Sequence, residues 1–484
     1  MANKQQKEKK SLSSFSILFI ILILLTIVSW IFSGQKFSPT VPAGGTEKVN
    51  HVVGARLSDL VMSPFNGFRD AIDICVFVLI LGGFLNIVTK TGALEAGIQH
   101  VVRRLKGNEL VLIPILMFLF SIGGSTYGMS EETIPFYSLL AVTMVASGFD
   151  TIVSAATVML GAGAGVIGST INPFATGVAM DALKSVHIKP DTSIILMIGV
   201  VLWLVTTGYC IFYVMKYARK VKADKGSTIL SLQEQEDMDT SFSQPETKEI
   251  AFTNKRKLIL TIFAFAFAIM VVALIPWESF NVTIFKGWTA FLTGQSFGNW
   301  YFGDLAMWFF LISLIISIIY GLTENEIVET FIVGSKDILS VVLIIVVARG
   351  ASIIMQTTHL DLFILDRSAN ILQGFSPILF VIGAYILYLF LSILIPSTSG
   401  LAYVSIPVMG ALANHIGLNA SVMIMIFTAG CGLINLITPT SGVVMGGLQM
   451  SKIDYSTWMK FMIKPLVIIG ISNLIILIIS ILLV

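Results

Sequence analysis

Two adjacent carboxylates, Glu131 and Glu132, lie in the stretch GGSTYGMSEETIPF (residues 123–136), between segments that are otherwise apolar. A glutamate inside a membrane is costly unless it has a partner or contacts water. The chain has no Lys or Arg between residues 110 and 183, and none between 368 and 451. These segments therefore provide no counter-charge. The pair indicates a site that takes a proton, Na⁺, or the ammonium or guanidinium group of a substrate.

A basic side chain from another helix is the alternative partner for the pair. The candidates outside these segments are Lys90, Lys336, Arg349 and Arg367. With such a partner the glutamates would form a structural ion pair and would have no role in binding. The residue types alone leave both interpretations open.

Hydroxyl and amide side chains accompany the carboxylates in four short clusters. The candidate substrate-binding residues are Ser125, Thr126, Glu131, Glu132, Asn172, Ser397, Thr398, Ser399, Asn435, Thr438 and Thr440, with Ser169 and Ser441 beside them. A single Ser or Thr often bonds the preceding helical turn or a neighbouring helix. Four clusters are harder to explain by packing. We expect them to bind carboxylate groups, together with N–H groups freed at helix N-termini.

The composition is that of an integral membrane protein. Of the 484 residues, 55% are hydrophobic and 12% charged, and the mean hydropathy is +0.89. A typical soluble domain has about 25% charged residues. The near-neutral net charge of +2 gives no basic footprint for nucleic acid. The expected surroundings are a lipid bilayer.

Metal and cofactor enzymes find no support in the motifs. Cys75, Cys210 and Cys431 lie in apolar stretches, where we expect small buried side chains without disulfides. The five histidines are scattered, so no zinc motif is present. The glycine pattern GAGAGVIG at residues 161–168 matches a dinucleotide fingerprint but follows no strand, so no cofactor is expected. Close helix packing through its glycines is the simpler alternative to a functional break.

Two other classes of membrane protein are weighed and set aside. A hydrolase needs a nucleophile with a positioned base, yet no His lies near Ser125 or Ser397 and no Gly-x-Ser-x-Gly motif occurs. An ion channel also uses carboxylates and hydroxyls, but it arranges them in a ring around one axis. The paired segments described below do not form such a ring. We therefore expect neither an enzyme nor a channel.

About nine membrane crossings follow from the apolar runs, since a crossing helix needs about 20 apolar residues. They lie near residues 15–33, 73–90, 151–180, 192–215, 257–276, 305–321, 330–350, 418–450 and 457–483. The Lys/Arg clusters fall on one side if the N-terminus is cytoplasmic, which predicts an outside C-terminus. The first run is expected to be an uncleaved anchor.

Two further apolar segments on either side of the acidic pair are too short to cross. Residues 111–122 cover about 18 Å as a helix, and residues 133–146 are similarly short. The Ser/Thr/Gly-rich sequence between them cannot expose its backbone to lipid. This predicts a re-entrant hairpin at 109–148. The pattern Ser-Thr-x-Gly followed by Ile-Pro returns 272 positions later (397 − 125), which predicts a second hairpin at 375–415.

Each predicted hairpin precedes a helix with a polar break, at GAGAGVIGSTINP (161–173) and AGCGLINLITPTSG (429–442). Gly and Pro should interrupt these helices. The predicted fold class is an all-α polytopic membrane protein built from inverted repeats. The first repeat covers 1–225 with a broken helix at 151–180. A flexible cytoplasmic linker covers 226–256, and 257–484 holds a connecting helix and the second repeat, with a broken helix at 418–450. Such repeats are typical of secondary transporters.

The motifs GGSTYGMSEETIPFYSLL, GAGAGVIGSTINPFATGVA, IPSTSGLAYVSIPVMG and LITPTSGVVMGG resemble the YfcC branch of the C4-dicarboxylate carrier (DcuC-type) family in the ion transporter superfamily. The likeness covers nearly the whole chain. It implies a homodimer in the bacterial inner membrane, with a scaffold and a mobile transport domain working as an elevator. It also implies a Na⁺ or H⁺ coupling-ion site near Ser125, Thr170, Asn172 and Thr438. The tips read Ser-Thr-Tyr and Ser-Thr-Ser, where dicarboxylate carriers of the superfamily have Ser-Asn-Thr.

The sequence thus predicts a secondary active transporter of a small charged amino acid, as an antiporter or an ion-coupled symporter. The acidic pair lacks a counter-charge in its own segments, which favours a cationic amino acid. The resemblance implies that this substrate is of the arginine/ornithine type, because the YfcC-like branch includes arginine/ornithine exchangers. The alternative is a Na⁺- or H⁺-coupled C4-dicarboxylate carrier, in which the glutamates bind the coupling ion and the hydroxyls bind the substrate.

Overall fold

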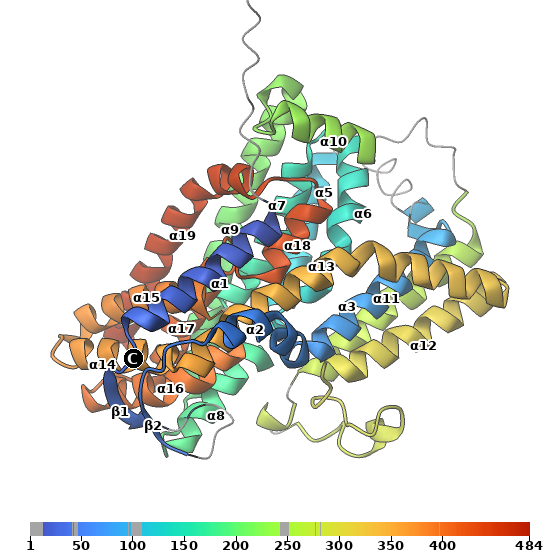
Figure 1. The fold of residues 1–484 in the computed structure, drawn as a ribbon. Helices are drawn as coiled ribbons and strands as arrows, with labels where there is room; N and C mark the ends of the chain where they lie inside the picture. Colours follow the sequence, from blue (N-terminus) through green and yellow to red (C-terminus); the bar gives the residue numbers. More distant parts are fainter. Residues whose placement is uncertain are drawn as a thin grey trace, which may run out of the picture.

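The computed structural model describes residues 13–40, 42, 47–94, 96–97, 109–242, 251–275, 277–280, 282–395 and 397–484. The described chain is a bundle of α-helices (Figure 1). Its one sheet pairs the short antiparallel strands β1 (Lys36–Thr40) and β2 (Val49–His51), which the sequence analysis did not predict. The all-α class is otherwise as expected.

Eight helices in the described part of the chain are long and apolar enough to cross a membrane. They are α3 (Ile72–Lys90), α5 (Leu112–Tyr127) with its preceding 3₁₀ turn, α9 (Thr192–Ala223), α11 (Asn254–Leu274), α12 (Phe302–Tyr320), α13 (Glu324–Thr358), α15 (Pro377–Leu394) and α19 (Tyr455–Leu483). Helix α1 (Ser14–Ile31) is apolar but shorter in its described part. The number of long apolar helices makes the chain a multi-pass membrane protein.

Helix α5 differs from the prediction that this segment is too short to cross. The helical run covers Glu109–Tyr127, which is 19 residues and so about 28 Å at 1.5 Å per residue. The glycines near its end allow α5 to touch α7 (Thr151–Ile167). A Cβ at Gly124 would lie 2.0 Å from the carbonyl oxygen of Ala162. Packing against another backbone therefore replaces the missing side-chain shielding, and the helix continues to Tyr127.

Both predicted helix breaks are present. Helix α7 ends at Ile167, and α8 (Val178–Ser185) begins after a π-helical turn at Pro173–Gly177. Helix α17 (Ala420–Ile434) is separated from α18 (Gly442–Met450) by seven residues that contain Pro439. The preceding glycines do not break α7. A Cβ at Gly165 would lie 2.1 Å from the carbonyl oxygen of Ser121, so the motif serves close packing on α5.

The helices form two groups that meet along α13 (Figure 1). In the α13 group, α2 (Leu57–Asp70) and α3 pack against α13, α12 packs on α3, and α11 packs on α12. In the hairpin group, α5, α6 (Ile134–Ala146), α7, α8 and α9 pack with α15, α16 (Thr398–His415), α17 and α19. Helix α18 packs on α13, and smaller contacts between the groups join the turn before α6 and α6 to α3, α5 to α11, and α15 to α13. Helix α14 (Leu360–Leu372) lies beside α15, α16 and β1.

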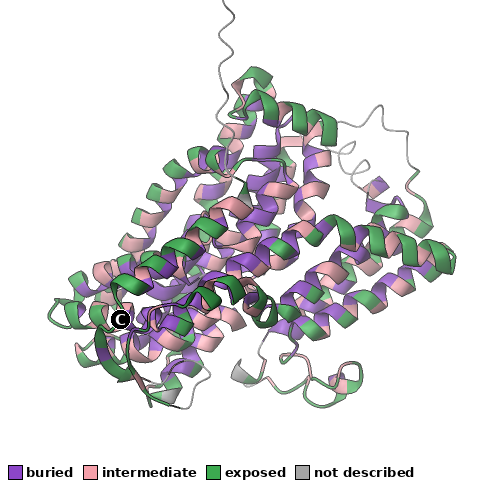
Figure 2. Ribbon diagram, viewed as in Figure 1, coloured by how far each residue is buried: buried purple, intermediate pink, exposed green. Residues whose placement is uncertain are grey.

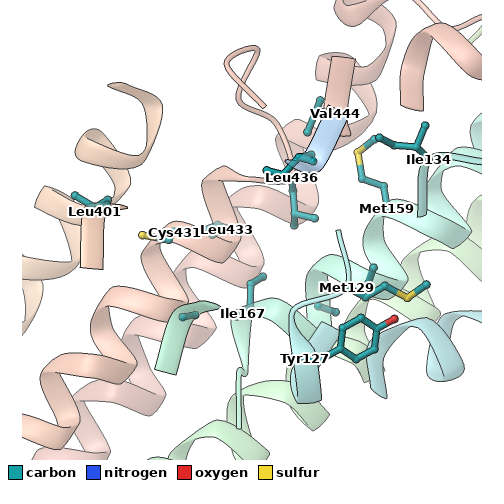
Figure 3. Packing of buried hydrophobic residues seen from close by; sticks show 14 of the residues in the cluster. Tyr127, Met129, Ile134, Met159, Ile167, Leu401, Cys431, Leu433, Leu436 and Val444 are labelled. Atoms are coloured by element: carbon teal, nitrogen blue, oxygen red, sulfur yellow. The ribbon is translucent and has the colours of Figure 1, made fainter. Parts of the chain in front are cut away.

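Buried residues are concentrated where these helices meet, and exposed residues follow the outer faces of α1, α10 (Leu232–Phe242) and α19 (Figure 2). Two units each consist of a helix pair followed by a broken helix: the first unit is α5–α8, and the second unit is α15–α18. Much of the core lies between these two units. Figure 3 shows Tyr127 and Met129 of the first unit and Leu433, Leu436 and Val444 of the second within this packed region. All five are at most 7% exposed. Buried apolar side chains thus pack around the polar break of each unit.

Part of the predicted flexible linker is a helix. Helix α10 is anchored by the buried Glu234, whose carboxylate accepts hydrogen bonds from the Asp454 N–H (2.8 Å) and the Thr457 hydroxyl (3.1 Å) at the start of α19. Thr228 donates to Asp150 at 2.6 Å, which ties the linker to the start of α7. Residues 243–250 of the predicted linker lie outside the described residues.

Candidate functional site

The turn between α5 and α6 places the two glutamates. Gly128 ends α5 because it adopts φ +79°, a left-handed conformation that suits glycine. Its N–H bonds the Gly124 carbonyl oxygen at 3.2 Å. A single 3₁₀ turn, Glu131–Thr133, then leads into α6, where Pro135 is at the helix start. Both carboxylates therefore belong to a short turn between two helix ends.

This turn forms part of the wall of a cavity of about 150 Å³, which both glutamates line. Glu132 is 2% exposed, and its carboxylate accepts a hydrogen bond from the Ser130 N–H at 3.0 Å. Glu131 is partly exposed. No basic side chain among the described residues lies within 4 Å of either carboxylate. The cavity wall thus carries two carboxylates without a direct ion pair.

Two helix N-termini from the second unit reach the same cavity. Ser397 caps α16 by accepting the Gly400 N–H at 3.2 Å, and Ser441 caps α18 by accepting the Val444 N–H at 3.4 Å. Residues 397–399 and 441–443 line the cavity. Helix N-termini carry partial positive charge and unpaired N–H groups, so they favour a carboxylate. The N-termini of α16 and α18 thus favour negatively charged groups, whereas the turn with Glu131 and Glu132 favours positively charged groups.

Asn435, at the end of α17, contributes an unpaired acceptor. Its amide nitrogen donates to the Thr398 hydroxyl at 3.3 Å. Its Oδ1 is buried, and no hydrogen-bond donor in the described chain reaches it. Buried polar atoms in proteins nearly always have a partner. Asn435 lines the cavity, so this unpaired oxygen belongs to a residue of the cavity wall.

The polar groups at the first break largely satisfy one another. The Ser125 hydroxyl donates to the Gly168 carbonyl oxygen at 2.8 Å and lies 3.1 Å from the Thr170 hydroxyl, which donates to the Ser125 carbonyl oxygen at 3.0 Å. Asn172 accepts the Phe174 N–H at 3.0 Å and donates to Ser169 at 2.9 Å. These bonds fasten the end of α5 to the break after α7.

Most of the residues predicted from the sequence come together in the cavity. Those that line it are Glu131, Glu132, Asn172, Ser397, Thr398, Ser399, Asn435 and Thr440, together with Ser441. Ser125, Thr126 and Thr438 lie behind this lining. The Thr126 hydroxyl donates to the Ile122 carbonyl oxygen at 2.7 Å, and Thr438 pairs with Thr440 at 2.7 Å. Of the four residues expected near a coupling ion, Ser125 and Thr170 bond each other, Asn172 follows them at the first break, and Thr438 belongs to the second break.

The cavity also has residues that the sequence analysis did not assign to a site. They are Arg349 of α13, the aromatic residues Tyr137, Phe174, Tyr301 and Phe302, and several apolar side chains. Arg349 was considered only as a structural partner. Its Nη1 lies 3.8 Å from Asp70 Oδ2, and it lines the cavity together with Glu131. No repeat relates Arg349 or Tyr301 to the predicted motifs, so no sequence signal marked them.

Among the described residues, no group of three or more His, Cys, Asp and Glu side chains could hold a metal ion. The cavity instead combines carboxylates, hydroxyls, an amide oxygen and helix N-termini. Such a set can bind a small solute that carries both a cationic group and a carboxylate. Each kind of group would meet its complement within one cavity.

Comparison with known proteins places this chain in a family. The profile of the C4-dicarboxylate anaerobic carriers (DcuC) matches residues 12–482. A Haemophilus influenzae protein without an assigned function is 30% identical over 97% of each chain. The Escherichia coli (strain K12) protein YfcC, whose name assigns it provisionally to basic amino acid antiport, is 26% identical over 85% of this chain and 81% of its own.

Two solved transporters align over nearly the full length of the chain. The YdaH transporter of Alcanivorax borkumensis is 14% identical, with a TM-score of 0.46, and the alignment covers 97% of this chain and 98% of that one. MtrF of Neisseria gonorrhoeae, described as one of a class of antimetabolite efflux pumps, is 17% identical, with a TM-score of 0.45 over 98% and 96% of the two chains.

Proposed function

The chain belongs to the C4-dicarboxylate anaerobic carrier (DcuC) family, and from that premise we propose that it is a secondary active transporter of a small cationic amino acid of the arginine or ornithine type. The observation that carries the substrate class is the pairing of Glu131 and Glu132 with two helix N-termini in one cavity. The carboxylates bind the guanidinium or ammonium group of the side chain. The N-termini of α16 and α18 bind the α-carboxylate.

Several further features fit this substrate. The free Oδ1 of Asn435 accepts a hydrogen bond from the α-ammonium group. The aromatic rings of Tyr301 and Phe174 are suited to contact with a planar guanidinium or an alkyl stem. The name of the relative YfcC, which concerns basic amino acids, agrees with the same class. Antiport is the favoured mode.

The family description supports a second candidate, a Na⁺- or H⁺-coupled C4-dicarboxylate carrier. Arg349 in the cavity wall is the observation that favours it, because a guanidinium is a common carboxylate ligand. In this case Glu131 and Glu132 bind the coupling ion, and the hydroxyls of residues 397–399 bind the substrate. The hydroxyl and carbonyl oxygens around Ser125 and Thr170 are of the hard type that Na⁺ prefers.

The wider mechanism is proposed on the resemblance. The units α5–α6 and α15–α16 act as re-entrant hairpins, and the hairpin group moves past the α13 group as an elevator. The protein works as a homodimer in the bacterial inner membrane, with a cytoplasmic N-terminus and an outside C-terminus. Breaks at a central cavity, where both units meet, are the arrangement that alternating access requires.

Counterflow in proteoliposomes tests the substrate class. Vesicles loaded with unlabelled arginine or with succinate are supplied with labelled arginine, ornithine or succinate, in Na⁺ or choline medium. Exchange of arginine for ornithine, with no response to succinate, is the expected result. Succinate uptake that depends on Na⁺ or on a pH gradient would establish the dicarboxylate candidate instead. Exchange of neither solute would refute both.

A further inference from the structure

Helix α13 carries a row of side chains that meets the hairpin group. Val341, Ile345 and Arg349 are spaced by four residues and so share one face of the helix. Helix α18 lies directly on the first two. A Cβ at Gly446 would be 2.5 Å from Val341 Cγ1, and a Cβ at Gly442 would be 2.4 Å from Ile345 Cγ1. Arg349 therefore continues the row past the N-terminus of α18 and into the cavity, whose wall it forms with Ile345.

Helix α2 places the carboxylate of Asp70 beside Arg349. A Cβ at Gly67 would lie 2.6 Å from the Val346 carbonyl oxygen, so α2 and α13 touch at the backbone. Asp70, at the end of α2, follows Gly67 by three residues and comes within 3.8 Å of Arg349 Nη1. This contact is long for a charge-assisted hydrogen bond. Arg349 is held by Asp70 on its own helix group, but loosely.

The charges around Arg349 are almost all negative. Glu131 and Glu132 line the same cavity, and Asp70 Oδ2 lies 3.8 Å from Arg349 Nη1. Arg349 is the one basic residue of the described cavity wall. An arginine side chain stays protonated in proteins. A cationic solute that binds Glu131 must therefore compete with a cation that belongs to the protein.

We propose that Arg349 is an internal counter-ion: in the substrate-free protein it lies beside Asp70 and attracts Glu131 across the shared cavity, and the cationic group of the substrate takes over the place beside Glu131. The proposal rests on the proposed function. It makes Arg349 a specificity-determining residue that sets how strongly the cavity holds a cation.

The position of Arg349 also links binding to movement. Arg349 belongs to the α13 group and Glu131 to the hairpin group, so their attraction connects the two groups when the cavity is empty. A bound cation replaces this attraction within the hairpin group itself. The loaded hairpin group can then move, while the empty one is retained, and the transport mode becomes exchange.

The rival role for Arg349 is a direct ligand of the substrate carboxylate, and the two roles predict opposite changes. The test measures binding of arginine and of agmatine, which lacks the carboxylate, to purified wild type, Arg349→Gln, Arg349→Lys and Asp70→Asn. Isothermal titration gives Kd, and thermal unfolding with size-exclusion profiles shows that each variant folds. Parallel proteoliposomes compare exchange with net uptake into empty vesicles.

An internal counter-ion predicts that Arg349→Gln binds both arginine and agmatine about fivefold or more tightly, a change typical of coupled sites. Net uptake into empty vesicles should rise relative to exchange. Arg349→Lys should stay near wild type because it keeps the charge. Asp70→Asn should weaken binding of both solutes, because Arg349 is then left to Glu131 alone.

Weaker or unchanged binding by a folded Arg349→Gln protein would overturn the inference while the wild type still binds arginine. Loss of arginine binding with unchanged agmatine binding would identify Arg349 as the carboxylate ligand instead. If the wild type binds neither solute, the proposed function fails first, and the inference fails with it. These outcomes are distinguishable in one set of titrations.

Discussion

The two hairpin-and-broken-helix units contain similar polar side chains but use them differently. In the first unit, Ser125 and Thr170 bond each other, and Asn172 bonds Ser169 and the Phe174 N–H. The charge that this unit contributes to the cavity comes from Glu131 and Glu132 in the turn before α6. In the second unit no carboxylate is present; the N-terminal residues of α16 and α18 and Asn435, whose buried Oδ1 is unpaired, line the cavity. The comparison shows that positions related by a repeat can diverge into a fixed framework and a set of free ligands.

The largest effect should come from the charge in the first unit. The double variant Glu131→Gln with Glu132→Gln keeps the shape of the turn but removes its charge. Losing one partner of a buried charged contact typically costs about 2–5 kcal/mol, so arginine exchange should fall at least about 30-fold. Glu329→Gln, on the exposed surface of α13, is the matched control and should leave exchange unchanged. Unchanged exchange by the double variant would remove both glutamates from the mechanism.

A smaller effect, on thermal stability, should distinguish two glycines of α7: Gly165, which packs against α5, and Gly163, which lines the cavity. Gly165→Ala would place Cβ 2.1 Å from a backbone oxygen of α5, which cannot move without separating the helices. Gly163→Ala would instead meet the end of the flexible Leu436 side chain, also at 2.1 Å. Overpacking costs about 1–3 kcal/mol, so Gly165→Ala should lower the midpoint of thermal unfolding clearly more than Gly163→Ala. Equal shifts would show that α5 and α7 are not fixed to each other.

These contrasts also explain what the sequence could and could not predict. The helix breaks could be predicted because Pro173 and Pro439 act locally, and the glutamates stood out because their own segments contain no basic residue. The length of α5 was misjudged, because Gly124 packs against α7, and sequence patterns do not show which helix covers a glycine. Arg349 lies 218 positions after Glu131 (349 − 131), and only tertiary packing brings it to the cavity.

The roles of individual hydroxyls were equally inaccessible. Ser125 and Ser397 occupy matching positions in the two repeats, and both have a polar partner. Ser397 caps a helix that begins at the cavity, whereas Ser125 lies within the last turn of a helix and turns toward the break after α7. Whether such a residue binds a solute depends on where its helix ends. That end is fixed by φ at Gly128 and by the N-cap at Ser397, and both are properties of the folded backbone.

The second unit should show a moderate effect at its unpaired acceptor. Asn435→Ala removes the free Oδ1 and the bond to Thr398. A neutral hydrogen bond contributes about 0.5–1.5 kcal/mol, so the Kd for arginine should rise up to about tenfold. Asn172→Ala in the first unit is the comparison, and it should lower thermal stability more than affinity because Asn172 caps a turn. If both variants change affinity alike, the two breaks have the same role, and the contrast between the units is wrong.

The smallest effect should be a pH dependence confined to the first unit. Its broken helix starts at Asp150, whereas Asn419, which cannot titrate, starts the corresponding helix of the second unit. Burial raises the pKa of Asp150 above its ordinary value of 3.8, although hydrogen bonds from Thr228 and Tyr217 oppose this shift. A raised pKa in the folded state means that the stabilising contribution is complete below pH 3.8 and is lost as pH rises through the raised value.

Asp150→Asn should therefore gain stability relative to the wild type as pH rises through this window, because the neutral amide needs no desolvation of a charge. The measurement is the difference in unfolding midpoint between the two proteins from pH 3.5 to pH 8. Asn419→Asp is the control in the second unit, where the position is exposed, and it should not produce the same decline. A wild type and an Asp150→Asn protein with parallel pH profiles would show that the N-cap of α7 carries no proton-linked stability. Such a result would also mean that the N-caps of α7 and α17 do not differ in the pH dependence of stability.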